Sequence, residues 1–278
     1  MKSKIANALR LKTHPVGLLW TDEKPEGAIQ FHEGKWGCVM AMFAQAAVQG
    51  KPSAFDRETF GCIGGGVGLG FGNQYENWQG GIECFYGFLS SGNEGREGTE
   101  EIVHDIRRTG RTAAAERFIH GERYVKSEEL VKKFVASLPI IDIPSRYVIF
   151  TPLEDIPAGG PRPEVVIFVV NPDQLSALVF LAGYGRGTLD NVRILSGAGC
   201  QNIGINAYRE AHANPPRAVV GLTDISARLY TAHTLGHQVM TFALPFVMFE
   251  ELESNVEGSF LEREQWQSLM DGAEFAGT

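Results

Sequence analysis

Hydrophobic positions in the first fifty residues switch between helical spacing and short continuous runs. Residues 2–12 place their apolar side chains at helical spacing, which predicts an amphipathic helix. The run "PVGLLW" at 15–20 follows and predicts a short buried strand. Residues 36–50 are mostly apolar and stop at Gly50, two positions before a proline, which predicts a buried helix.

The middle of the chain is more polar, and its helices are marked by acidic first turns. We expect one helix from Thr99 to Ile119 and another from Ser127 to Leu138, each starting at a hydroxyl residue followed by two glutamates. Residues 73–98, which come before them, are rich in glycine, polar and aromatic residues and predict a loop.

Continuous β-branched and aromatic runs dominate the second half and predict strands buried on both faces. Asn171 and the proline after it predict the start of a helix over 171–184. The predicted strands are 146–153, 164–170, 217–222 and 238–246. We therefore expect an α+β or mixed α/β fold: a single large domain over residues 1–278, with a mixed β-sheet flanked by helices.

Composition narrows the classes of partner. The chain has 278 residues and a formal net charge of −8, which argues against a nucleic-acid-binding surface. No apolar run reaches the roughly 18 residues of a membrane span, and the first twenty residues lack the apolar core of a signal peptide. We expect a cytoplasmic protein that binds neither nucleic acid nor membrane. A small-molecule ligand and a homo-oligomer, formed through the aromatic residues of 71–90, remain open.

One stretch, "FGCIGGGVGLGFG" at 60–72, packs seven glycines and Cys62 into thirteen residues. It lacks the lysine of a phosphate-binding Walker loop, and Leu69 stands where the third glycine of a dinucleotide loop would be. Glycine is also unfavourable in helices and strands. We expect a glycine-rich loop, which either packs backbone against backbone or approaches a ligand closely.

The four cysteines form no C-x-x-C pair, so zinc ribbons and ferredoxin-type motifs are excluded by spacing. Cys38 opens a predicted helix, Cys62 lies in the glycine stretch, and Cys200 follows two glycines at a predicted strand-to-helix turn. Brought together, these three thiolates would suit an iron–sulfur cluster or zinc. The alternative is that each is a small buried apolar residue, which is the interpretation we favour for Cys84.

The segment 38–71, with Cys38, Cys62 and Leu69, resembles the signature of the DUF169 family of bacteria and archaea. Further similar features are Cys200 near glycines and the Asp224-x-x-x-Arg228 spacing in "LTDISARLY", and the "FALPFVMFEEL" segment resembles the closing strand and helix of that family. The resemblance covers most of the chain and implies no particular activity. Cys84 has no counterpart in it.

Three functions are compatible with these residues. The first is a metal or iron–sulfur protein with Cys38, Cys62 and Cys200 as ligands and a redox or small-ligand role. The second is a non-metal small-molecule binding protein with an apolar pocket. The third is an enzyme with Cys62 or Cys200 as nucleophile. The residues predicted to contact the small ligand or cofactor are Gly64, Gly65, Gly66 and Arg228, and the pocket of the second function would also include Trp36, Tyr75 and Trp78.

Overall fold

The computed structural model describes residues 1–157 and 159–272, and their contacts divide the chain into two compact units. The first unit comprises Met1–Phe71 and the chain from Ile141 onward, and the second comprises Gly72–Ile140. No linker marks either junction in the sequence, and a single domain over residues 1–278 stays a prediction. In the described ranges, no helix has the length and apolar character needed to cross a membrane.

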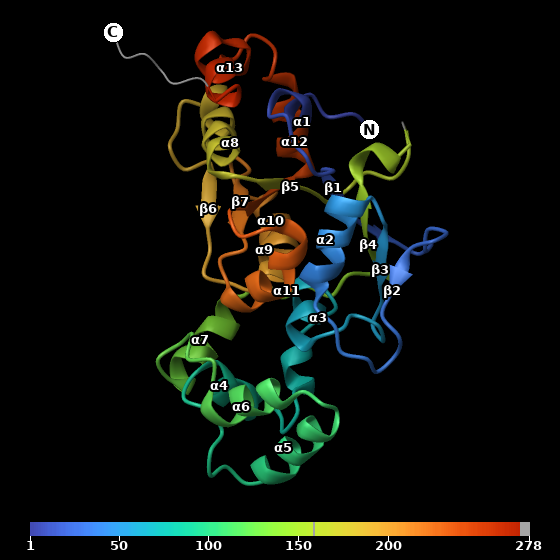
Figure 1. The fold of residues 1–278 in the computed structure, drawn as a ribbon, viewed down its shortest axis with the longest axis vertical. Helices are drawn as coiled ribbons and strands as arrows, with labels where there is room; N and C mark the ends of the chain where they lie inside the picture. The colour runs from blue at the N-terminus through green and yellow to red at the C-terminus, as the bar shows by residue number, and fades with distance from the viewer. Residues whose placement is uncertain (158, 273–278) are drawn as a thin grey trace. The chain divides into compact units, whose positions relative to one another are not determined.

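A mixed sheet of eight strands forms the centre of the first unit, as the α+β or mixed α/β prediction required (Figure 1). Its order is β2-β3-β4-β1-β5-β8-β7-β6, with parallel pairs at the two edges and antiparallel pairs between them. The strands are β1 (Val16–Thr21), β2 (Ile29–Gln30), β3 (Ser53–Phe55), β4 (Tyr147–Pro152), β5 (Val165–Val170), β6 (Val192–Ile194), β7 (Ala218–Gly221) and β8 (Met240–Pro245). The short strands β2, β3 and β6 were not among the predicted ones.

Strand β5 shows why both faces of this sheet are covered. All six of its residues are buried, and alternate side chains enter two different apolar cores. Val166 and Phe168 belong to one core, while Val165 and Ile167 belong to the other. A strand with two buried faces reads as a continuous apolar run, so the sequence pattern was sufficient to predict it.

Two groups of helices cover these faces (Figure 1). The first core includes residues of α1 (Lys4–Ala8), α8 (Pro172–Tyr184), α12 (Phe246–Ser254) and α13 (Glu264–Met270). The second includes residues of α2 (Val39–Gln49), α3 (Ile63–Leu69), α9 (Gly199–Ile203), α10 (Ile205–Glu210) and α11 (Ile225–Leu235). Three of the four cysteines lie on this second face. The 3-10 turns of the first unit are η2 (Leu153–Asp155) and η3 (Phe260–Glu262).

The second unit is helical. It contains η1 (Gln74–Asn77), α4 (Ile82–Leu89), α5 (Thr99–Arg108), α6 (Thr112–His120) and α7 (Glu128–Ser137). The expected single helix over 99–119 is wrong, because the chain turns at Gly110, where φ is +79°. The expected loop over 73–98 is wrong in part, since it contains α4, whose apolar face is buried. Ser127 does cap α7 as predicted, by accepting a hydrogen bond from the backbone N–H of Leu130.

Candidate functional site

Four helix starts meet on the second face of the sheet, and each begins with a chemically active side chain. Cys38 is the N-cap of α2, and Cys62 is the N-cap of α3. Cys200 is the second residue of α9, and Asp224 is the N-cap of α11. The predicted positions of Cys38 at a helix start and of Cys200 at a turn into a helix are therefore confirmed, whereas Cys62 caps a helix that was not predicted.

The glycine stretch is a helix and not the expected loop. Residues Ile63–Leu69 form α3, which contains four glycines and ends at Gly70, where φ is +94°. Intrinsic propensity disfavours such a helix by roughly 1 kcal/mol for each glycine. Tertiary packing overrides that preference here, because α3 lies against both α9 and the start of α2.

Two of these glycines explain the packing. A Cβ placed on Gly68 would lie 2.7 Å from the carbonyl carbon of Cys200 and 2.8 Å from the backbone nitrogen of Gln201. A Cβ on Gly65 would lie 2.5 Å from Cγ2 of Val39, which directly follows Cys38. The absence of side chains at Gly65 and Gly68 therefore lets α3 bring Cys62 close to both other cysteines.

Backbone groups of α3 and α2 contact the sulfur atoms directly. The N–H of Gly65 donates to Sγ of Cys62 at 3.2 Å, and Val39 offers its backbone N–H to the same sulfur. The Cys200 thiol donates to the carbonyl oxygen of Gly64 at 3.3 Å. Cys62 and Cys200 thus both bond to the first turn of one helix.

Burial and mutual repulsion keep these thiols protonated. Burial raises the pKa of Cys38 to about 12, with a further contribution from Cys62. Burial also raises the pKa of Cys62. It raises the pKa of Cys200 well above the usual range of a thiol, and the negative charges of Cys62, Asp224 and Cys38 raise it further. The pKa of the Asp224 carboxyl is raised by burial as well, against hydrogen bonds from Ala227 and Gly199. The three thiols and this carboxyl are therefore one electrostatically coupled group.

The raised pKa of Cys38 predicts slow alkylation in the metal-free native protein. At pH 8 about one in ten thousand Cys38 side chains would be thiolate, against about a quarter in an unfolded chain with a thiol pKa of about 8.5. Iodoacetamide labelling of Cys38, followed by mass spectrometry, should be about a thousandfold slower in the native protein than in urea.

The same shift makes stability fall with pH. The native state keeps protons that the unfolded chain releases, so this contribution is complete below about pH 8.5 and is lost as pH rises from there toward the folded pKa of about 12. In the iodoacetamide experiment described above, equal labelling rates of Cys38 in the native and unfolded states would contradict its protonation in the native protein.

Comparison with known proteins agrees with the resemblance noted in the sequence. Residues 4–255 match the family model of DUF169, whose description is "Uncharacterised ArCR". The chain belongs to the DUF169 family. Neither a curated protein nor a solved structure matches it.

Arg228 of this DUF169 protein is engaged by its own backbone. Its guanidinium donates to the carbonyl oxygens of Leu222 and Val239, each at 3.1 Å, and also to that of His237. Leu222 has a φ of +60°, an uncommon conformation for a leucine, and lies in the turn that leads to Asp224. Arg228 therefore holds this turn. A contact between Arg228 and a ligand stays a prediction, as do ligand contacts of Gly64, Gly65 and Gly66.

Replacement of Arg228 by lysine should lower the free energy of unfolding by about 1–3 kcal/mol. The planar guanidinium donates to three carbonyl oxygens at once, and the single ammonium group of lysine lacks that geometry. The exposed Arg209→Lys is the matched control and should change stability by less than about 0.5 kcal/mol. Urea unfolding of both variants measures the difference. An Arg228→Lys variant as stable as the wild type would show that these hydrogen bonds contribute little.

Cys84 belongs to the second unit. It is buried in an apolar cluster with Val103, Ile106 and Phe118, as expected for a cysteine with a packing role. Tyr75 and Trp78, which we expected to line a ligand pocket, pack in the same unit on Phe85, with ring centroids 3.9 and 5.0 Å away.

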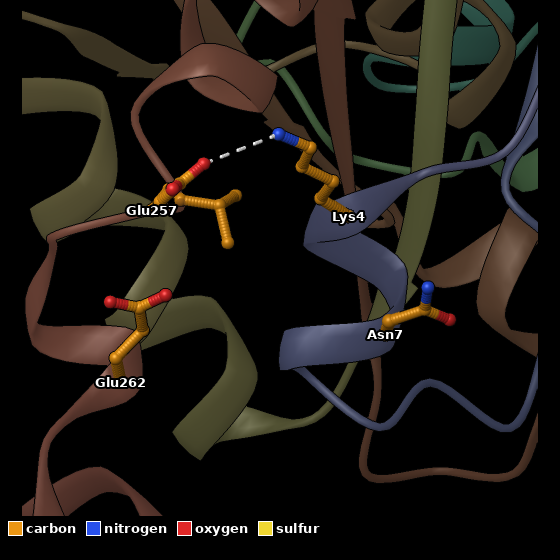
Figure 2. Close-up of a pocket in the computed structure, with 5 residues that line it drawn as sticks. Lys4, Asn7, Glu257 and Glu262 are labelled. Carbon is orange, nitrogen blue, oxygen red and sulfur yellow. Dashed lines mark ion pairs between the residues drawn. The ribbon is translucent and has the colours of Figure 1, made fainter.

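A surface pocket of about 310 Å³ lies between α1 and the segment that follows α12 (Figure 2). Lys4, Asn7, Glu257 and Glu262 surround it, and the ammonium of Lys4 pairs with Glu257 at 3.8 Å. Both partners of that pair are largely exposed, so it adds little stability. The pocket contains none of the cysteines and is not the candidate site.

Proposed function

We propose that this chain binds a metal or iron–sulfur centre through the thiolates of Cys38, Cys62 and Cys200. One observation supports the proposal above all others. Three thiols from separate parts of the sequence meet at the first turn of α3. Cys62 caps that helix, and the Cys200 thiol donates to the carbonyl oxygen of its Gly64. Val39, which directly follows Cys38, lies against Gly65 of the same turn. Three neighbouring thiolates would repel one another, so ionising them together is unfavourable in the metal-free protein. A bound cation would attract all three and so stabilise the ionised form.

The helix starts favour the same role. Backbone N–H groups of Gly65 and Val39 point at Cys62, and such donors stabilise a metal-bound thiolate. Binding would replace the thiol protons, so affinity for the centre would increase with pH. The Cys200 thiol would also release its hydrogen bond to Gly64.

The arrangement favours an iron–sulfur cluster over zinc. Two thiolates on one tetrahedral zinc lie about 3.8 Å apart, because each Zn–S bond is about 2.3 Å long. Over residues 1–157 and 159–272, no three His, Cys, Asp or Glu side chains are grouped so that they could hold a single ion. A cluster of several irons binds thiolates that lie farther apart, and we therefore propose a cluster in place of a single zinc ion.

The grouping of three thiols favours a ligand role over a nucleophilic one. Burial raises the pKa of Cys38, Cys62 and Cys200 in the metal-free protein, which makes each a poor nucleophile, whereas a bound cation would itself stabilise the thiolates. We further propose a cytoplasmic location, because cytoplasmic thiols stay reduced and the four cysteines are free.

Purification without oxygen tests the proposal. We expect iron and acid-labile sulfide in stoichiometric amounts, together with a broad visible absorption that bleaches on reduction. Zinc without sulfide would support a thiolate metal site but contradict the cluster. Protein that holds neither metal, and takes up neither after incubation with ferrous iron, sulfide and a thiol reductant or with zinc, would contradict the proposed function.

A further inference from the structure

The carboxylate of Asp224 faces the start of α9, where Cys200 lies. Its Oδ2 accepts a hydrogen bond from the backbone N–H of Gly199, and its Oδ1 accepts one from Ala227 at 2.6 Å. These two bonds join the beginnings of α9 and α11. The side chain therefore lies directly beside the cysteine that α9 carries.

The first turn of α2 reaches the same place. A Cβ placed on Gly199 would lie 3.2 Å from Oδ2 of Asp224 and 3.1 Å from Cγ of Met40. Met40 is two residues beyond Cys38, so the carboxylate lies where α2, α9 and α11 meet. Consistent with this position, Asp224 raises the pKa of all three thiols.

Asp224 has the capacity to bind a metal without losing its present bonds. An ionised carboxylate offers about four acceptor sites, and the two N–H donors use two of them. Three cysteines leave one iron of a four-iron cluster without a thiolate. The fourth cysteine, Cys84, is enclosed in the apolar cluster of the second unit.

We propose that Asp224 is the fourth ligand of a [4Fe–4S] cluster whose other ligands are Cys38, Cys62 and Cys200. This inference rests on the proposed function. The carboxylate oxygen is a harder ligand than a thiolate and holds its iron less firmly. The iron bound by Asp224 is therefore the one that the cluster loses first, and its position is the one open to exchange.

Controlled oxidation by ferricyanide makes this iron observable. Ferricyanide takes one electron from [4Fe–4S]²⁺ to give [4Fe–4S]³⁺, which releases Fe²⁺ and leaves a paramagnetic [3Fe–4S]⁺ cluster. Electron paramagnetic resonance measures that product, and a ferrous chelator measures the iron released. Both readouts depend on the ligand of the fourth iron, and only a residue within bonding reach of that iron would protect it when replaced by cysteine.

Three substitutions separate the outcomes. Asp224→Cys should slow the release of iron at least about tenfold, and Asp224→Asn should speed it by a similar factor, since even outer-sphere changes at metal sites have effects of this size. Asparagine is as good an N-cap as aspartate, so Asp224→Asn keeps the bond to Ala227, although it loses the one to Gly199. Asp224→Ala should behave like Asp224→Asn.

The result that overturns the inference differs from the result that overturns the function. If the wild type contains a four-iron cluster and the asparagine and cysteine variants release iron at its rate, Asp224 is not a ligand and the cluster proposal stands. If the wild type contains no iron and sulfide and takes up neither, the inference fails, and the proposed function fails with it only if the protein also binds no zinc. Slower release from Asp224→Cys together with faster release from Asp224→Asn, in proteins with native circular dichroism, supports the inference.

Discussion

Cys62→Ser is expected to reduce the iron bound per chain to less than about a tenth of the wild-type amount, because loss of a direct ligand exceeds the effect of an outer-sphere change. Cys62 is the central thiol of the group: its charge raises the pKa of both Cys38 and Cys200. Its sulfur also receives the N–H of Gly65 at 3.2 Å. Serine keeps a cap for α3 but is a poor ligand for iron.

The matched control is Cys84→Ser, which alters a buried cysteine in the second unit. We expect Cys84→Ser to lower the stability of the protein, because a polar hydroxyl replaces a sulfur that is buried among apolar side chains such as Phe118. The variant should nevertheless keep the full iron content. Iron, sulfide and visible absorption are measured on both variants after identical anaerobic preparation. Equal iron in Cys62→Ser and the wild type would remove Cys62 from the ligand set and leave the proposal without its central residue.

Most strands of the sheet, and the helices expected over 2–12, 36–50 and 171–184, could be predicted because their determinants are local. Strand β5 is a run of six buried residues, and Asn171 begins α8 with a capping box that includes Gln174. Both signals lie within a few residues of the element they define. The short strands β2 and β6 lack such a signal, because they are two and three residues long and depend on a neighbouring strand.

The candidate site could be predicted in part for the opposite reason. The contexts of Cys38, Cys62 and Cys200 were visible in the sequence, but their proximity depends on contacts between α2, α3 and α9. Asp224 appeared only within a family resemblance. Its position before an apolar helix is a signal for an N-cap, and nothing local shows which thiols it faces.

The error over the glycine stretch has the same origin. Helix propensity favours a loop at 60–72, because glycine is a poor helix former. The loop prediction did not take into account the segment that packs on α3 and leaves no room for side chains on one side of this helix. That segment is the backbone of Cys200 and Gln201, which would lie within 3 Å of a Cβ at Gly68. Helix α3 is therefore specified by the segment it packs against, more than a hundred residues later in the chain.

Gly68→Ala tests this interpretation, and we expect it to lower the free energy of unfolding by about 1–3 kcal/mol, the usual cost of overpacking. Alanine would ordinarily stabilise a helix by up to about 1 kcal/mol relative to glycine, so the two effects oppose each other. The clash should prevail, because the added Cβ meets backbone atoms, the nearest at 2.7 Å, and no side-chain rotation can relieve it. Urea unfolding of the metal-free protein measures the change.

Gly183→Ala, in α8, is the matched control. Its Cβ would have no neighbour closer than 3.4 Å, so helix propensity alone should make that variant neutral or more stable by up to about 1 kcal/mol. Gly68→Ala should also bind less iron, because relief of the clash moves Cys200 away from Cys62, whereas Gly183→Ala should keep its iron. A Gly68→Ala variant as stable and as rich in iron as the control would show that α3 and α9 can separate without harm to the site. The glycines would then have to be explained by something other than the approach of the two thiols.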